Sequence, residues 1–294
     1  MHPVVHVAPE SDRAIEEAIT AAGGQIGPLE EADALVWLNW DSNSFDVELP
    51  ERVRWVQLPA AGVEQWLDHA GDGRVWTSAA GAYGLPVAEH ALALMLAGTR
   101  RLGGCARAQT WTDPPAMPLD GSTVAIVGAG GIGRALIGLL APLDVEVLAV
   151  TRRGRDGTLP ADRLGEVLPA AHHVVIAAPA TPDTRHIIGA AELDAMRDDA
   201  WLVNVARGSL VDTDALVTAL ANGSIAGAAL DVTDPEPLPD GHPLWTEPRA
   251  LITPHIANPK ATLRRYLARH VGENVARFAR GEELIAVIDA DAGY

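Results

Sequence analysis

Residues 122–133 read S-T-V-A-I-V-G-A-G-G-I-G, an apolar run that leads directly into Gly128-x-Gly130-x-x-Gly133. The apolar run is typical of a buried parallel strand, and the pattern after the glycines is helical. Glycines at these positions permit a tight turn and bring the backbone close to a pyrophosphate at the helix N-terminus. The same spacing occurs in simple turns, but a strand before it and a helix after it favour a dinucleotide site.

Short apolar runs alternate with helical stretches along the whole chain, which predicts α/β layers with parallel sheets. A first set of strands is expected at residues 4–8, 34–38, 55–58 and 75–77. A helix is expected between the first two strands, from an N-cap at Ser11 to Ala22. A second set of strands is expected at residues 123–127, 145–150, 174–178, 202–205, 228–232 and 251–253.

Two longer helices and a connector set the expected domain boundaries. Residues 86–101 predict a helix that opens with proline and closes with two arginines, and the proline-rich segment 113–119 follows as a connector. Residues 261–280 predict an arginine-rich helix, and we expect the apolar run 284–288 to return to the first domain. The sequence thus predicts two doubly wound parallel-sheet domains, one of residues 1–99 and 265–294, the other of residues 100–264.

Composition excludes several classes of protein. The chain has 294 residues, 48% hydrophobic and 21% charged, and a net charge of −17, which has the wrong sign for binding nucleic acid or an anionic membrane. A single lysine, Lys260, makes Schiff-base chemistry improbable. A single cysteine, Cys105, excludes an internal disulfide and a cysteine cluster for metal. With no long apolar segment, we expect a cytoplasmic protein without a membrane or metal partner.

The strand after the glycine turn indicates which dinucleotide binds. An NAD site usually carries an acidic residue about 20 residues after the glycines, to bind the ribose 2′-hydroxyl. Here the strand ends in Thr151, Arg152 and Arg153. Two guanidinium groups and a hydroxyl suit a 2′-phosphate, so NADP is favoured and NAD remains possible. The alternative is that these arginines are solvated on a surface loop.

Three polar side chains of catalytic type follow later strands, at the sheet edge where ligands bind in open α/β sheets. Arg207 can clamp a carboxylate, His255 can exchange a proton near neutral pH, and Glu236 can orient that histidine. Any one of them alone would carry little weight, because isolated charged side chains are usually solvated.

The chain from Val56 to its C-terminus resembles the D-isomer-specific 2-hydroxyacid dehydrogenases. The resemblance is carried by V-A-E-H-A-L-A-L-M-L-A, the glycine stretch, A-A-P-A-T-P-D-T-R-H-I-I, N-V-A-R-G-S-L-V-D, G-A-A-L-D-V with E-P-L-P, and T-P-H-I-A. The short chain, the T-R-R strand end and H-P-L-W look most like NADPH-dependent glyoxylate and hydroxypyruvate reductases.

The resemblance implies a Rossmann cofactor domain inserted into a smaller flavodoxin-like substrate domain, with the active site in the cleft between them. Hydride would pass to C2 of a 2-oxo acid while His255 donates a proton, with Glu236 keeping it protonated and Arg207 binding the carboxylate. Backbone N–H groups of Ala61 and Gly62 would bind the same carboxylate, and Asp231 would hold the nicotinamide amide. Further expected cofactor contacts are Gly131, Ile132, Pro179, Thr184 and Ala206. Trp37 and Tyr83 are expected to line the substrate pocket, with Trp40 and Trp245 as further candidates, and the alternative for each is a place in the core.

Several alternatives stay open at this point. A homodimer is the family expectation, and the identity of the 2-oxo acid, including a bulkier one, is undetermined. A redox-sensing relative that binds dinucleotide like a corepressor would keep the same fold. A formate-type dehydrogenase is disfavoured, because that branch typically carries Gln at the position of Glu236. Glu64 and Asn258-Pro259-Lys260 depart from the usual family pattern, the latter close to His255.

Overall fold

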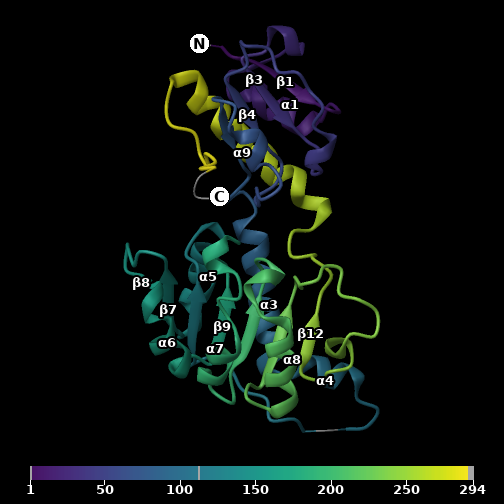
Figure 1. Cartoon of the computed structure of the whole chain (residues 1–294), viewed down its shortest axis with the longest axis vertical. Helices are drawn as coiled ribbons and strands as arrows, with labels where there is room; N and C mark the ends of the chain where they lie inside the picture. The colour runs from purple at the N-terminus through teal and green to yellow at the C-terminus, as the bar shows by residue number, and fades with distance from the viewer. Residues whose placement is uncertain (1, 112, 291–294) are drawn as a thin grey trace. The chain divides into compact units, whose positions relative to one another are not determined.

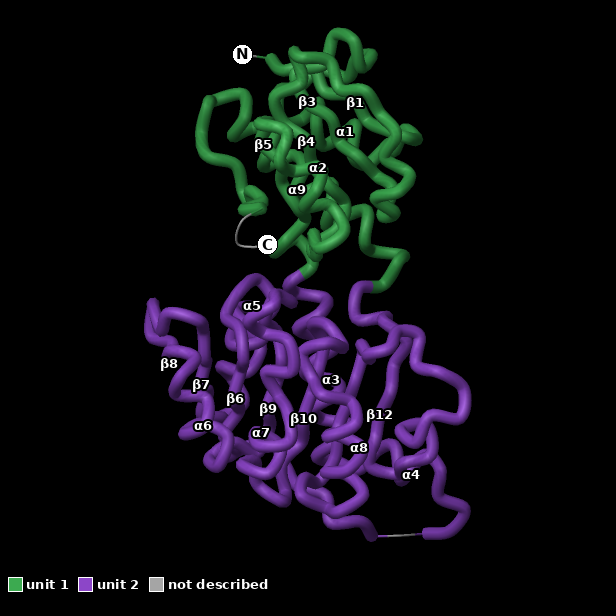
Figure 2. The backbone as a smooth tube through the Cα atoms, in the orientation of Figure 1, with its two compact units in different colours: residues 1–83, 259–294 green, residues 84–258 purple. Residues whose placement is uncertain are grey.

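The structure, a computed structural model, describes residues 2–111 and 113–290, and the chain divides into two compact units. Unit 1 comprises residues 1–83 and 259–294, and unit 2 comprises residues 84–258 (Figure 2). Each unit contains one all-parallel sheet with helices, which confirms the predicted α/β class. The last residues of the expected first domain, 291–294, lie outside the described residues.

Unit 1 is built on a sheet of order β2-β1-β3-β4-β5. Its core contains large aromatic and aliphatic side chains, among them Trp66, Trp76 and Leu58, all nearly inaccessible to solvent. Helices α1 and α9 pack against each other (Figure 1). The strands are β1 (Val4–Ala8), β2 (Gln25–Ile26), β3 (Ala34–Trp37), β4 (Trp55–Gln57) and β5 (Val75–Thr77), and the helices are α1 (Arg13–Ala21), α2 (Leu67–Ala70) and α9 (Lys260–Arg280).

The C-terminal segment returns to unit 1, as expected from its isolated apolar run. Val287 forms an antiparallel bridge with Thr77, and the Ile288 N–H donates to the Trp76 carbonyl at 2.8 Å. Asn274 of α9, fully buried, holds the same segment because its side-chain amide exchanges hydrogen bonds with the backbone N–H and C=O of Ile285.

Unit 2 is built on a sheet of order β12-β11-β10-β9-β6-β7-β8. The central strands are rich in Val, Ile, Leu and Ala and are buried, as expected when helices cover both faces of a sheet. The strands are β6 (Thr123–Val127), β7 (Glu146–Thr151), β8 (Leu159–Pro160), β9 (His173–Ile176), β10 (Trp201–Asn204), β11 (Gly227–Leu230) and β12 (Ala250–Ile252). The helices are α3 (Gly84–Thr99), α4 (Leu102–Arg107), α5 (Gly131–Leu140), α6 (Leu164–Val167), α7 (Ala190–Ala195) and α8 (Thr213–Asn222).

The strand order of unit 2 reverses direction at β6 (Figure 2). The chain passes from β6 outward to β7, and then returns across β6 to β9 and onward to β12. Since parallel crossovers are right-handed, α5 lies on one face and α6, α7 and α8 on the other. The carboxyl ends of β6 and β9 therefore form the switch point at which ligands bind in folds of this kind.

In the structure the first domain boundary follows Tyr83. The sequence predicts this boundary near residue 100. Helix α3 accounts for the difference, because it packs against α5, β10 and β11 of unit 2. Nearly every residue of α3 is apolar, so the helix is buried along much of its length. A second boundary falls at Pro259, a few residues before the expected position, and Pro259 itself is the N-cap of α9.

Local details correct some expectations. The N-cap of α1 is Asp12 and not Ser11: the Asp12 carboxylate accepts hydrogen bonds from the N–H groups of Ala14 and Ile15 at 3.0 and 3.1 Å. The two-residue edge strands β2 and β8 were not predicted, because so short a strand shows no periodicity. The other expected strands begin and end within two residues of the observed ones.

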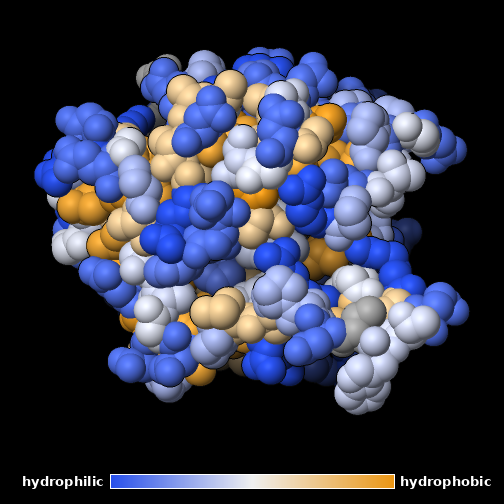
Figure 3. Space-filling view, turned by 90° about the horizontal axis from the view of Figure 1, so that it is seen from below, coloured by the Kyte–Doolittle hydropathy of each residue, from blue (hydrophilic) through white to orange (hydrophobic). Residues whose placement is uncertain are grey.

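Two general properties bear on function. Within residues 2–111 and 113–290, no helix is long and apolar enough to span a membrane, and no group of three or more His, Cys, Asp or Glu side chains could hold a metal ion. Hydrophilic and apolar residues are intermingled on the face shown in Figure 3.

Candidate functional site

The glycine turn follows β6 and leads into α5 at the switch point. Gly128 has a φ of +105°, which other residues rarely adopt, and a Cβ there would come within 2.6 Å of the Ala177 and Ala178 backbone. A Cβ at Gly133 would overlap the Gly128 carbonyl, whereas one at Gly130 would meet nothing within 4 Å. No side chain caps α5 at Gly130. The turn therefore presents open space and uncapped backbone N–H groups, a cradle that fits a pyrophosphate.

Thr151, Arg152 and Arg153 lie where predicted, at the carboxyl end of β7 and just beyond it. The Thr151 hydroxyl lies 2.7 Å from the Thr158 hydroxyl and accepts from the Gly154 N–H at 3.2 Å, so it shapes the turn between β7 and β8. Arg152 and Arg153 are exposed. Thr151 therefore stabilises the turn, and Arg152 and Arg153 lie on the surface at the carboxyl edge of the sheet.

The loops after β9 and β10 contain the other predicted cofactor contacts. The Thr184 hydroxyl donates to the Pro179 carbonyl at 2.8 Å, which ties the two residues together after β9. After β10, the buried Asn204 accepts from the Ala206 N–H at 3.1 Å and donates to the Arg207 carbonyl at 2.8 Å. These bonds hold the backbone that carries Arg207, and the Arg207 guanidinium donates to the Ala206 carbonyl at 2.9 Å.

His255 and Glu236 form a close pair in unit 2. The Nδ1 atom of His255 lies 2.6 Å from Oε1 of Glu236, and the second carboxylate oxygen accepts from the Thr233 N–H at 3.4 Å. Both side chains are about half exposed, at 53% for His255 and 41% for Glu236. With Nδ1 engaged, Nε2 is the nitrogen left to exchange a proton with a ligand. Two segments 19 residues apart in sequence thus form an acid–base pair.

Asp231, at the end of β11, is 2% exposed and anchors the loop that carries His255. Its carboxylate accepts from the Thr253 hydroxyl at 2.6 Å and from the N–H groups of Ile256 and Ala257 at 3.0 Å. Burial alone would raise the pKa of this carboxyl, but these bonds, together with one from His90, outweigh it and lower the pKa to about 2. The carboxylate that was expected to hold the nicotinamide amide is therefore engaged by protein donors.

In unit 1 the segment after β4 contains Ala61 and Gly62, the residues whose N–H groups were expected to bind the substrate carboxylate. Ala61 is exposed and Gly62 half-buried, and neither N–H has a partner among residues 2–111 and 113–290. The loop is tied back to the sheet by the Ala79 N–H, which donates to the Ala60 carbonyl at 2.7 Å. Two neighbouring backbone N–H groups are thus available to an anionic ligand.

Trp37 and Tyr83, which were expected to line a substrate pocket, are buried in unit 1. Trp37 is 3% exposed and packs edge-on against Phe45 in the core. The Tyr83 hydroxyl donates to the Pro59 carbonyl at 2.8 Å, and burial raises the pKa of its phenol. Neither side chain has appreciable surface to offer a ligand in this structure, whereas Trp40, whose ring lies 6.3 Å from that of Tyr83, is exposed.

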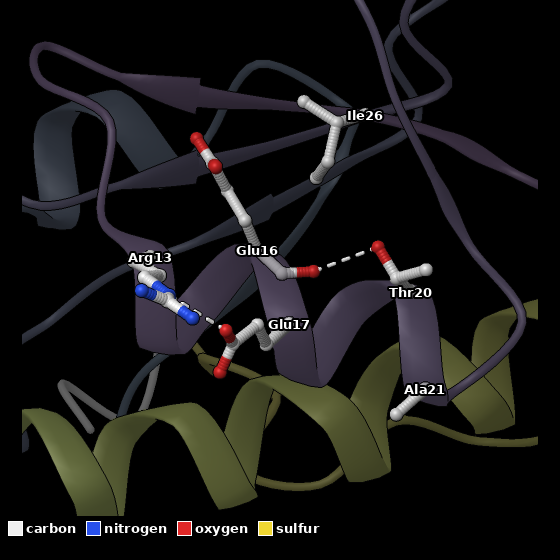
Figure 4. Close-up of a pocket in the computed structure, with 6 residues that line it drawn as sticks. All are labelled: Arg13, Glu16, Glu17, Thr20, Ala21 and Ile26. Carbon is white, nitrogen blue, oxygen red and sulfur yellow. Dashed lines mark hydrogen bonds and ion pairs between the residues drawn. The ribbon is translucent and has the colours of Figure 1, made fainter.

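A shallow hollow beside α1 is formed by residues 13–26, none of which is a predicted site residue. It is lined by Arg13, Glu16, Glu17, Thr20, Ala21 and Ile26 (Figure 4). Its one ion pair, Arg13–Glu17 at 2.8 Å, is largely exposed, as is usual for pairs four residues apart on a helix. The hollow contains none of the predicted site residues.

Sequence reasoning missed two members of the Asp231 cluster, His90 and Thr253. Thr253 belongs to the T-P-H-I-A segment but was not assigned a role, and His90 lies 163 residues earlier in chain order. The signal for His90 in the sequence is an imidazole in a predominantly apolar helix, which is also the pattern of a buried structural histidine.

Comparison with known proteins agrees with this architecture. The profile of the family "D-isomer specific 2-hydroxyacid dehydrogenase, NAD binding domain" matches residues 92–257. An uncharacterized protein in the proB 3′ region of Corynebacterium melassecola is 38% identical over 94% of this chain and 95% of its own length. A glyoxylate reductase of Aeropyrum pernix is 34% identical over 87% of this chain and 83% of its own.

A similar solved structure is a D-isomer specific 2-hydroxyacid dehydrogenase from Xanthobacter autotrophicus Py2, in complex with NADPH and MES. It shares 26% identity, covers the whole of both chains and has a TM-score of 0.81. The chain therefore belongs to the D-isomer-specific 2-hydroxyacid dehydrogenases, a family of NAD(P)-dependent oxidoreductases, and carries their NAD-binding domain.

Proposed function

We propose that this protein reduces a small 2-oxo acid, of the size of glyoxylate or hydroxypyruvate, to the D-2-hydroxy acid with NADPH. The observation that carries the proposal is the His255–Glu236 pair at 2.6 Å, located in the unit that also contains the glycine turn. The relative from Aeropyrum pernix, named glyoxylate reductase, supports a substrate of this size.

A bound nicotinamide would supply the hydride, while residues of unit 2 donate the proton and bind the substrate carboxylate. His255 donates a proton from Nε2 to the carbonyl oxygen, because its Nδ1 is held by Glu236. The Glu236 carboxylate orients the ring and balances the charge of the imidazolium. Arg207 binds the substrate carboxylate and polarises the carbonyl that accepts the hydride.

The coenzyme preference rests on the carboxyl end of β7. Arg152 and Arg153 are exposed there, and no acidic residue occupies residues 151–153 to bind a ribose 2′-hydroxyl. Two guanidinium groups suit the 2′-phosphate of NADPH. The NADPH complex of the Xanthobacter autotrophicus relative agrees with this preference. We therefore expect NADH to be the weaker hydride donor.

Substrate binding also involves unit 1. The free N–H groups of Ala61 and Gly62 are the proposed second set of donors for the substrate carboxylate. Unit 1 is therefore the proposed substrate domain and unit 2 the coenzyme domain, with α3 belonging to the latter by its contacts.

The test is a steady-state panel of 2-oxo acids of increasing size, from glyoxylate and hydroxypyruvate through pyruvate to 2-oxoisocaproate and phenylpyruvate. Each is assayed with NADPH and with NADH, and kcat/KM is compared. We expect the highest value for a two- or three-carbon acid with NADPH, and a loss of at least 100-fold in His255→Ala, the order that general acid catalysis contributes. A maximum at the bulky acids would contradict the proposed substrate size. No turnover at all, with NADPH still bound, would instead indicate a nucleotide-sensing protein.

A homodimer is part of the proposal. Three apolar side chains of α4 and the following segment are strongly exposed: Leu102, Met117 and above all Trp111, which is 100% exposed. Because large apolar side chains are seldom exposed so fully, we infer that this stretch of the chain forms an interaction surface. Light scattering should give about 62 kDa, twice the 30.9 kDa of the chain, and a Trp111→Ser variant should shift toward the monomer. A monomeric wild-type protein would refute this part.

A further inference from the structure

His90 lies on the apolar helix α3 and reaches the Asp231 cluster. Its side chain is 20% exposed. The Nε2 atom lies 3.0 Å from the Thr253 hydroxyl and 3.3 Å from Oδ1 of Asp231. All three residues belong to unit 2, so their contacts lie within one compact body.

The hydrogen bonds determine which atom carries which proton. The Thr253 hydroxyl has a single hydrogen, and at 2.6 Å from the ionised Asp231 carboxylate it donates that hydrogen there. The Thr253 oxygen can then only accept from His90, so Nε2 of His90 carries a hydrogen. His90, Thr253 and Asp231 therefore form a directed chain in which the imidazole donates and the carboxylate is the final acceptor.

The same carboxylate fixes the backbone on both sides of His255. Thr253 precedes His255 and is bonded through its hydroxyl, while Ile256 and Ala257 follow it and are bonded through their N–H groups. The His255 N–H itself donates to the Asp231 backbone carbonyl at 2.9 Å. His255 adopts a φ of +51°, a conformation that a histidine keeps only when its surroundings hold it.

We propose that His90 is a positioning residue for His255, which acts by donating Nε2–H to Thr253 and Asp231 and so orients the carboxylate that holds the His255 loop. The inference rests on the proposed function, because it concerns the geometry of the proposed proton donor. A buried carboxylate takes the direction that its donors give it, and a shift of about 1 Å in a catalytic group can lower turnover by up to 100-fold. His90 touches neither substrate nor coenzyme in this role.

The test compares two replacements of His90. Glutamine carries its side-chain nitrogen the same number of bonds from Cβ as Nε2 and keeps the donor, whereas leucine fills similar space without one. We expect His90→Leu to lower kcat about tenfold with the KM for NADPH unchanged within twofold, and His90→Gln to restore most of kcat. Equal losses in both variants would overturn the donor role, since a residue needed only for packing would not be rescued by glutamine.

A second measurement does not depend on activity. Hydrogen exchange of the peptide covering residues 253–257 reports the anchoring of the loop, because the N–H groups of Ile256 and Ala257 exchange only when released from Asp231. We expect at least fivefold faster exchange in His90→Leu and wild-type exchange in His90→Gln. Wild-type exchange in both variants would refute the proposal.

Controls separate this proposal from the one on which it rests. Glu89→Gln changes an exposed neighbour on α3 and should leave both readouts at wild-type values. If His90→Leu does not fold, Thr253→Val removes the middle member of the hydrogen-bond chain and should have the same effects. Thr253→Ser keeps the hydroxyl and should retain wild-type turnover and loop exchange. If the wild-type protein reduces no 2-oxo acid, the proposed function fails, yet faster loop exchange in His90→Leu alone would still establish the positioning role.

Discussion

Replacing Asp231 with asparagine tests the anchor of the His255 loop. Asparagine keeps the shape of the side chain but has one oxygen instead of two and no charge. If its oxygen takes the place of Oδ1, its NH₂ group faces the Ala257 N–H, which now donates to Oδ2 at 3.0 Å. Two donors would then face each other at a site that is 2% exposed, so one buried N–H group would lose its acceptor.

The expected loss of stability follows from two overlapping terms. A buried donor without an acceptor costs about 1–3 kcal/mol. The pKa of Asp231, lowered from 3.8 to about 2, corresponds to about 2 kcal/mol in favour of the ionised carboxylate in the folded state. Because both terms describe the same hydrogen bonds, we expect Asp231→Asn to lower the free energy of unfolding of unit 2 by about 3 kcal/mol, and not by their sum.

The stabilisation by the Asp231 carboxylate should depend on pH. The folded pKa lies below 3.8, so the contribution of the carboxylate is fully present above about pH 5 and declines as the pH falls through 3.8 toward 2. Between pH 7 and pH 3 the difference between wild type and Asp231→Asn should therefore shrink by about 1 kcal/mol. Urea unfolding with pulse-labelled hydrogen exchange, followed on peptides of β11 and β12, measures unit 2 separately from unit 1.

A matched control is Asp194→Asn, which removes an exposed carboxylate from α7 in the same unit. It should change stability by no more than about 0.5 kcal/mol at either pH. A loss below about 1 kcal/mol in Asp231→Asn at pH 7, or a difference from wild type that is the same at pH 3, would refute the reasoning that the ionised carboxylate holds this loop.

Three further predictions concern the coenzyme site and the core of unit 2. Gly133→Ala should abolish NADPH binding measured by fluorescence titration, because its methyl group would overlap the Gly128 carbonyl; unchanged affinity would show that the turn can relax. Arg152→Ala should raise the KM for NADPH at least tenfold and that for NADH less than twofold, and equal losses would mean that the 2′-phosphate is not bound there. Burial, with a smaller effect from His172, lowers the pKa of His173 to about 4. The folded state holds this ring neutral at no cost above about pH 6.5, and the cost in stability grows as the pH falls toward 4. Because of His173, the free energy of unfolding should fall by about 2 kcal/mol between pH 7 and pH 5. This fall should be absent in His173→Val, and an identical pH profile in the variant would contradict the lowered pKa.

Most of the fold could be predicted, because its signals are local. The strand β6 lies at the predicted residues 123–127, and α9 ends at Arg280 before Gly281, a residue in the left-handed conformation suited to a helix C-terminus. Continuous apolar runs of four to six residues indicate buried parallel strands without any knowledge of the neighbouring strand. The edge strands β2 and β8 were missed because two residues pair only where the neighbouring chain lies.

The assignment of α3 could not be made from sequence. Its apolar residues predict a buried helix, but the surface that buries them, formed by α5, β10 and β11, is a property of the tertiary structure. The same holds for Trp37 and Tyr83: an aromatic side chain is equally suited to a pocket and to a core, and only packing decides between them.

The sequence by itself determined the α/β class, the glycine turn and the residue types of the proposed chemistry, because each depends on the order and spacing of neighbouring residues. Only the tertiary structure showed that His255 meets Glu236 at 2.6 Å, and that Asp231 is engaged by Thr253, Ile256, Ala257 and His90. The physical reason is that a hydrogen bond depends on distance and direction in space. His90 and Thr253 are 163 residues apart, and no periodicity in the chain records that β12 and α3 bring them within 3.0 Å.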